Sequence, residues 1–234
     1  MNTFKIKSNT VELTFEKEYG NLVGMSVLNN EWSILARPHL GRNWELLIPL
    51  QTRRNNPVFG YKQKLSTLYV SEDGKKAEMS WKNVVSEYGG THDVHVFITV
   101  EAIEDAIVWR TRVVNNERNC IVENVCSPIV GDLRPDGLRN INVFLEGYSN
   151  PTILNIRPNF TNNKGYWGVD TPTLVLNGPP AHTPYFLIRS EDNKGIYIAP
   201  YQNQDQHTLL RFRLFPGFVT DDAGQVPMDD FIGG

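Results

Sequence analysis

Histidine and carboxylate side chains are the first candidates for chemistry in this chain. The five histidines are His39, His92, His95, His182 and His207. A sugar epimerase needs a base and an acid on either side of the sugar ring, typically a glutamate and a histidine. His92 and His95 are three residues apart in a strand-like segment, so their side chains are expected on opposite faces. The spacing therefore predicts no shared metal ion and no joint catalytic role for these two histidines.

Paired carboxylates would be needed for glycoside hydrolysis, at a separation of about 5 to 10 Å. The chain contains 26 acidic residues, and nothing in their spacing brings two of them together. The chain also lacks a glycine-rich phosphate loop and a Gly-x-Ser-x-Gly motif. We therefore predict no catalytic residue in this chain, and we expect it not to be an enzyme by itself.

Cysteine usage argues against a disulfide or a metal centre. The two cysteines, Cys120 and Cys126, are six residues apart in one strand-like segment. This arrangement is poor geometry for a disulfide and supplies too few thiols for a metal site. The prediction is two buried free thiols, no metal and no cofactor.

Aromatic side chains in polar, glycine-containing loops are better candidates, because aromatic faces stack on sugars while polar groups bind the hydroxyls. We predict a carbohydrate-binding role for five loop side chains: Trp44, Tyr166, Trp167, Tyr201 and His182. Trp44 also directly precedes an apolar run, so an alternative role at the start of a buried strand stays open. The other tryptophans in strand-like segments are expected in the core: Trp32, Trp81 and Trp109.

Short segments of alternating apolar residues, separated by turn residues, must position these loops. Clear examples are Val11 to Phe15 with its return strand Leu22 to Leu28, and His92 to Glu101. The Asp73-Gly74 pair between two such segments is a strong hairpin signal. No window shows capped helical periodicity. The chain is therefore predicted to be all-β, a large antiparallel β-sandwich with little helix.

A single β-sandwich domain is predicted over residues 1–218. Prolines and glycines are scattered through the connections, and no linker divides the chain. Residues 219–234 are polar and rich in glycine and acidic residues, so we expect a tail at a boundary where a further domain would begin.

Charge and hydropathy limit the partners and the location. The formal net charge of −3 and the pI near 6.0 give no basic surface for nucleic acid. No segment approaches the ~20 apolar residues of a membrane span. Residues Met1 to Thr10 carry no apolar signal-peptide region, which favours the cytoplasm.

Three segments resemble the galactose mutarotase-like β-supersandwich, as found in N-terminal domains of multidomain glycoside hydrolases. Val11 to Asn30 is similar to the strand, turn and return strand that open those domains. Val108 to Leu133 looks like their central hairpin, with the turn at Asn115 to Arg118. Ser190 to Gln202 resembles their late hairpin, in which a Gly-aliphatic-Tyr-aliphatic strand leads into a polar loop.

This resemblance implies a non-catalytic domain that packs on, or frames, the substrate cleft of a downstream catalytic barrel in the same polypeptide. The implied partners are carbohydrate and that barrel. The alternative is a stand-alone sugar-acting enzyme, such as an aldose 1-epimerase-like protein. The histidine loops and the C-terminal glutamate of the mutarotases have no match in this sequence.

Overall fold

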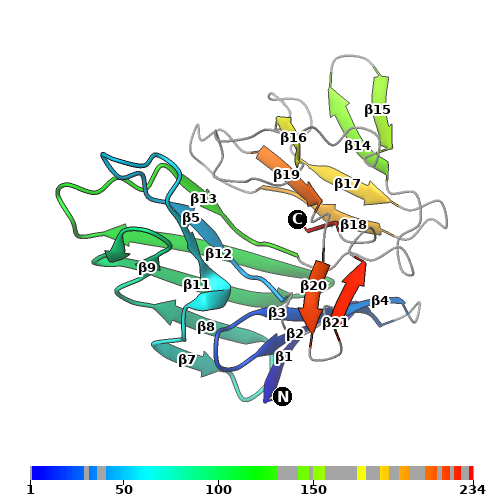
Figure 1. Cartoon of the computed structure of the whole chain (residues 1–234). Helices are drawn as coiled ribbons and strands as arrows, with labels where there is room; N and C mark the ends of the chain where they lie inside the picture. Colours follow the sequence, from blue (N-terminus) through cyan, green and yellow to red (C-terminus); the bar gives the residue numbers. More distant parts are fainter. Residues whose placement is uncertain are drawn as a thin grey trace. The chain divides into compact units, whose positions relative to one another are not determined.

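The computed structural model shows an all-β chain composed of antiparallel sheets (Figure 1). It describes residues 2–28, 32–35, 41–130, 142–147, 150–155, 173–177, 185–189, 195–200, 209–214, 218–221, 224–227 and 232–233. The chain divides into two compact units, one of residues 1–132 with 165–168, the other of residues 133–164 with 169–234. The predicted fold class is confirmed, whereas the single domain over residues 1–218 stays a prediction.

The first sheet of unit 1 has the strand order β1-β2-β3-β4. Its strands are β1 (Thr3–Lys7), β2 (Val11–Glu16), β3 (Leu22–Val27) and β4 (Trp32–Leu35). Alternation sends Leu13 and Phe15 of β2 inward, as predicted. Between β2 and β3, Gly20 has φ +70 and lies under the ring of Trp81, where a Cβ would come within 2.8 Å of it. Only glycine therefore fits this turn.

The second sheet of unit 1 has the order β12-β11-β8-β7 (Figure 1). Its strands are β7 (Thr67–Val70), β8 (Lys76–Trp81), β11 (Val94–Ile103) and β12 (Ala106–Asn115). The predicted Asp73-Gly74 turn joins β7 to β8, and Gly74 has φ +66. Val94, Val96, Ile98 and Val100 all point into the core, as the alternation of β11 predicts.

The predicted hairpin of Val108 to Leu133, with its turn at Asn115 to Arg118, is wrong over the described residues of this segment, which end at Val130. β12 pairs with β11 through the two-residue turn Glu104-Asp105, where Glu104 has φ 49. The later segment contributes only β13 (Asn124–Cys126), which pairs with β5 (Glu45–Leu47), and β5 in turn pairs with β6 (Pro57–Phe59). The tight turn lets β11 and β12 pair over ten residues each, so the ladder forms between the nearest neighbours in sequence.

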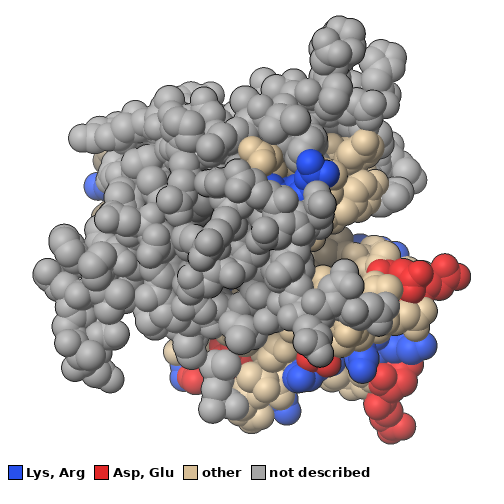
Figure 2. All heavy atoms as spheres, turned by 90° about the vertical axis from the view of Figure 1, so that its right-hand side faces the viewer, with Lys and Arg blue, Asp and Glu red and all other residues tan. Residues whose placement is uncertain are grey.

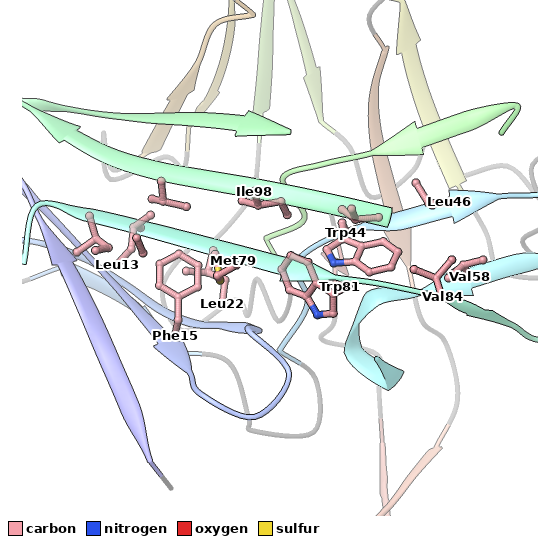
Figure 3. Packing of buried hydrophobic residues seen from close by; sticks show 14 of the residues in the cluster. Leu13, Phe15, Leu22, Trp44, Leu46, Val58, Met79, Trp81, Val84 and Ile98 are labelled. Carbon is pink, nitrogen blue, oxygen red and sulfur yellow. The ribbon is translucent and has the colours of Figure 1, made fainter. Parts of the chain in front are cut away.

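The core of unit 1 lies between these sheets (Figure 3). Phe15 of β2 lies 5.7 Å from Trp109 of β12, ring centre to ring centre. Trp44, directly before β5, meets Trp81 of β8 edge to face at 5.5 Å. Such contacts between rings from different sheets make unit 1 a sandwich with a shared aromatic core.

Two short elements complete unit 1 around this core. The hairpin of β9 (Val85–Ser86) and β10 (Gly90–Thr91) follows β8, and a single 3₁₀ turn, η2 (Gly60–Lys62), follows β6. None of the described residues belongs to a helix that is long and apolar enough to cross a membrane.

Unit 2 is also antiparallel, with sheets ordered β15-β14-β17-β18 and β16-β19-β22 and the separate hairpin β20-β21. The strands are β14 (Asn142–Gly147), β15 (Asn150–Asn155), β16 (Thr173–Asn177), β17 (Phe186–Arg189), β18 (Gly195–Ile198), β19 (Leu209–Leu214), β20 (Phe218–Asp221), β21 (Gly224–Pro227) and β22 (Ile232–Gly233). Segment 219–234, expected to be a tail, thus contains strands, and β22 pairs with β19.

Candidate functional site

The β9–β10 hairpin of unit 1 presents Tyr88 to solvent on a rigid support. Tyr88 is 55% exposed. Its backbone N–H donates to Oδ1 of Asn56 at 2.9 Å, and Nδ2 of Asn56 donates to the carbonyl of Ile48 at 2.9 Å. Asn56 is completely buried, so its amide anchors the tip of the hairpin to the core.

Gly89 completes this turn, because a side chain there has no room. An added Cβ would lie 2.7 Å from Oγ of Ser86 and 2.9 Å from Nδ2 of Asn56. The Gly89 N–H donates to Ser86 Oγ at 2.9 Å. The turn therefore holds Tyr88 in one backbone position without help from a ligand.

Two further aromatic rings lie on neighbouring elements. Tyr61 of η2 and Phe59 of β6 have ring centres 5.4 Å apart. The guanidinium of Arg42 lies 3.8 Å from the centre of the Tyr61 ring, and that of Arg53 lies 3.6 Å from the centre of the Tyr88 ring. In each of these cation–π contacts the guanidinium covers one face of the tyrosine ring.

An ion pair joins the elements that carry these rings. Lys62 Nζ lies 2.7 Å from the Glu87 carboxylate, and the same ammonium lies 5.2 Å from the centre of the Phe59 ring. The hydrogen bond to Glu87 raises the pKa of Lys62. We call these residues the aromatic surface: Arg42, Arg53, Phe59, Tyr61, Lys62, Glu87 and Tyr88. It offers flat apolar rings beside charged hydrogen-bonding groups, the combination that sugars require.

A second cluster lies at the base of the same hairpin. His92 Nδ1 lies 3.5 Å from a carboxylate oxygen of Glu117 and 4.0 Å from Sγ of Cys120. These three side chains bring their ligand atoms within 4.8 Å of one another. His92 is buried, whereas Glu117 and Cys120 are half-buried, so the cluster meets solvent on the Glu117 side.

Ser86 determines how the His92 ring presents its nitrogens. Its hydroxyl accepts the Gly89 N–H, donates toward the carbonyl of Gly90 at 3.4 Å, and lies 2.8 Å from His92 Nε2. This contact holds the ring by its Nε2 edge. The other ring nitrogen, Nδ1, therefore faces Glu117 and Cys120.

Cys120 is not arranged as a nucleophile. Burial raises the pKa of its thiol, and the neighbouring Glu117 carboxylate raises that pKa further. A nucleophilic cysteine needs the reverse, a positive environment that favours the thiolate. The geometry therefore gives no support to cysteine-based covalent catalysis.

Of the predicted carbohydrate-binding residues, Trp44 needs correction. The structure places it in the core, 1% exposed and packed on Trp81, so its ring cannot stack on a sugar. The alternative prediction for Trp44, a place at the start of a buried strand, is confirmed. Tyr166, Trp167, Tyr201 and His182 lie outside the described residues.

The two described histidines give no support to the epimerase alternative. His92 contacts Glu117, and His95 Nε2 lies 2.9 Å from a carboxylate oxygen of Asp93. An acid and a base that touch one another leave no room for a sugar ring between them. His39, His182 and His207 lie outside the described residues.

The aromatic surface and the cluster of His92, Glu117 and Cys120 both contain residues that the sequence analysis did not select. Tyr88 stands in Tyr88-Gly89-Gly90, an aromatic in a glycine loop, so the criterion applied to Trp167 would have selected it. The Glu117-x-x-Cys120 spacing was a weaker signal, because only the fold brings it to His92. In unit 2, Tyr185 and Tyr197 form another ring pair at 5.2 Å, with Tyr197 59% exposed.

Charged side chains of both signs lie close together on the described surface. Figure 2 shows acidic and basic side chains next to one another on the described part of one face. Ion pairs such as Lys64 with Glu18, at 2.6 Å, also bring the two signs together in unit 1. No broad area of one sign lies on the part of this face that the structure describes.

The all-β antiparallel architecture is the one that the resemblance to supersandwich domains implies, but this fold class is shared by many unrelated functions. The resemblance itself stays a prediction. The function must therefore be inferred from the described side chains. Neither the models of known protein families nor the curated proteins give a match to this chain.

Proposed function

We propose that this chain is a non-catalytic β-sandwich domain of a carbohydrate-active enzyme, of the glycoside hydrolase class, and that it binds glycan through the aromatic surface. The observation that carries the proposal is the exposure of Tyr88 on a hairpin anchored by the buried Asn56. An exposed tyrosine ring leaves apolar surface in contact with water. Here the hydrogen bond between the Tyr88 backbone and Asn56 holds the residue on the outside.

The contacts of the aromatic surface suit a sugar better than a flat apolar partner. Arg53 covers one face of Tyr88, which leaves the other face to stack on the CH groups of a pyranose ring. Glu87 and Lys62 stand beside these rings and supply an acceptor and donors for hydroxyl groups. Because these groups are already held by one another, little side-chain entropy is lost on binding.

Within this proposal the hydrolytic carboxylates belong to a catalytic barrel elsewhere in the same polypeptide. The described residues support this separation of the chain from the catalytic barrel. The acidic groups of the aromatic surface and of the His92 cluster are each paired with a basic group. Glu87 is paired with Lys62, and Glu117 with His92. A glycosidase needs one protonated and one ionised carboxylate facing each other instead.

The test is binding of the whole chain to an array of oligosaccharides, followed by titration calorimetry with the best ligand. We expect Tyr88→Ala to weaken binding by about tenfold or more, which corresponds to about 1.4 kcal/mol. Tyr61→Ala should weaken it as well, since Tyr61 contributes the second ring.

The matched control is Tyr69→Ala on β7, because Tyr69 is 56% exposed but lies outside the aromatic surface. Its affinity should equal that of the unaltered chain. Equal affinity of the Tyr88→Ala and Tyr69→Ala variants would overturn the aromatic surface as the binding site. Failure of the chain to retain any glycan would overturn the proposed function.

A further inference from the structure

We propose that His92, Glu117 and Cys120 form a binding site for a divalent transition-metal ion, zinc above all, which joins the β9–β10 hairpin to the segment after β12. This site is independent of glycan binding, since it uses none of the residues of the aromatic surface. An imidazole, a carboxylate and a thiol are the three side-chain types that bind zinc. Thiolate and imidazole ligands select zinc over magnesium or calcium.

The spacing of the three ligand atoms suits one small ion. Bonds of about 2.0 to 2.3 Å in a tetrahedron place neighbouring ligand atoms about 3.3 to 3.8 Å apart. His92 Nδ1 and the Glu117 oxygen are at 3.5 Å, and His92 Nδ1 and Cys120 Sγ are at 4.0 Å. All three atoms lie within 4.8 Å of one another. A modest inward movement of the half-buried side chains therefore brings all three within bonding distance of one ion.

Groups behind the ligands hold two of them in a metal-binding orientation. Oγ of Ser86 lies 2.8 Å from Nε2 of His92, so Nδ1 is the ring nitrogen that faces the other two ligands. The other oxygen of Glu117 accepts the backbone N–H of Asp93 at 2.5 Å. Outer partners of this kind fix ligand orientation in zinc sites.

The loop that carries Glu117 and Cys120 is also fixed. Asn115 Nδ2 donates to the carbonyl of Cys120 at 2.6 Å, and the side-chain oxygen of Asn115 accepts the N–H of Glu117 at 2.9 Å. One side chain thus holds both ligand-bearing residues of this loop. The site is therefore largely formed before the ion arrives, which lowers the cost of binding.

The local charge leaves a place for a cation. The Glu117 carboxylate supplies negative charge 3.5 Å from Nδ1 of His92, and Cys120 Sγ lies within 4.8 Å of both atoms. This charge favours a cation among the three ligand atoms. Zinc also replaces the thiol proton of Cys120, and three protein ligands leave a fourth position for water.

The test uses the whole chain without a histidine tag, titrated with zinc chloride against a chromophoric chelator. We expect one equivalent to bind with release of protons, because the cysteine must be deprotonated. Cys120→Ser, His92→Gln and Glu117→Gln should each abolish or strongly weaken this binding. Ser86→Ala, which removes the hydroxyl beside His92 together with its bond to the Gly89 N–H, should weaken it by about 10- to 100-fold.

Matched controls distinguish this site from adventitious binding. Cys126→Ser changes the other thiol, and His95→Gln changes a histidine paired with Asp93, and both should leave the zinc affinity unchanged. In the unaltered chain, zinc should protect Cys120 but not Cys126 from alkylation, a measurement that needs no variant to fold. The proposal is overturned if no saturable equivalent binds, if Cys120→Ser binds as tightly, or if zinc does not protect Cys120. None of these outcomes depends on glycan binding.

Discussion

At the scale of single residues, the same side-chain type has opposite roles in this chain according to its backbone environment. Trp44 and Tyr88 are both aromatics near loops, but one is 1% exposed and the other 55% exposed. The indole N–H of Trp44 has no hydrogen-bond acceptor among the described residues, so Trp44 contributes through packing. Tyr88 is kept out of the core by the Asn56 anchor.

Trp44→Ala tests the corrected role of this residue. Removal of a fully buried indole next to Trp81 should lower the free energy of unfolding by about 3–5 kcal/mol, because the cavity cannot collapse between two rigid sheets. Urea unfolding followed by circular dichroism measures this change. Tyr69→Ala, at an exposed site, should change the same free energy by only about 0.5 kcal/mol or less. Similar changes for the two variants would contradict the core assignment.

At the scale of elements, hairpins explain most of what the sequence allowed us to predict. The β2–β3 and β7–β8 hairpins carry their signals locally, in Gly20 and in Asp73-Gly74, so both were predicted correctly. The β11–β12 hairpin turns at Glu104-Asp105, and Glu104 adopts a positive φ without being glycine, so this turn has no local signal in its residue types. Its missing signal led to the wrong partner for β12.

The β7–β8 turn also makes a prediction about pH. The Ser71 hydroxyl donates to Asp73 at 2.6 Å, as does the Lys75 N–H at 3.0 Å, and these bonds hold the pKa of Asp73 below its ordinary value. A lowered pKa means that the ionised form stabilises the fold above pH about 4, and that this stabilisation is lost as the pH falls through the lower, folded-state pKa.

Asp73→Asn should therefore lower the urea midpoint at pH 7, and the difference from the unaltered chain should shrink at pH about 3. The measurement is a pair of urea titrations for each protein at the two pH values. Asp105→Asn in the β11–β12 turn is the control, since its carboxylate has no such bond to a described donor. A difference that is the same at both pH values would show that the ionised carboxylate of Asp73 does not stabilise the turn.

At the scale of the whole molecule, the candidate site depended on contacts that no sequence spacing encodes. The cluster combines Ser86 and His92 of one hairpin with Glu117 and Cys120 of a loop 25 or more residues later. The sequence prediction of no metal considered the two thiols and the His92–His95 pair, and not a mixed set of ligand types such as this cluster. The all-β class was predictable because alternation recurs in strands such as β2 and β11, whereas the site arises once, from tertiary contacts.

The division into two units makes a prediction at this scale. Every residue of the unit 1 core lies within residues 4–130, from Phe4 to Val130. We therefore expect a fragment of residues 1–132 to unfold cooperatively in urea, with Trp44 and Trp81 reporting by fluorescence. A fragment without a cooperative transition would instead favour the predicted single domain over residues 1–218.

The Ser86 hydroxyl belongs to both ends of the β9–β10 hairpin, since it accepts the Gly89 N–H beneath Tyr88 and lies 2.8 Å from His92. One oxygen atom therefore supports both the tip and the base of this short hairpin. A change at Ser86 is expected to disturb the turn at Gly89 and the position of the His92 ring together.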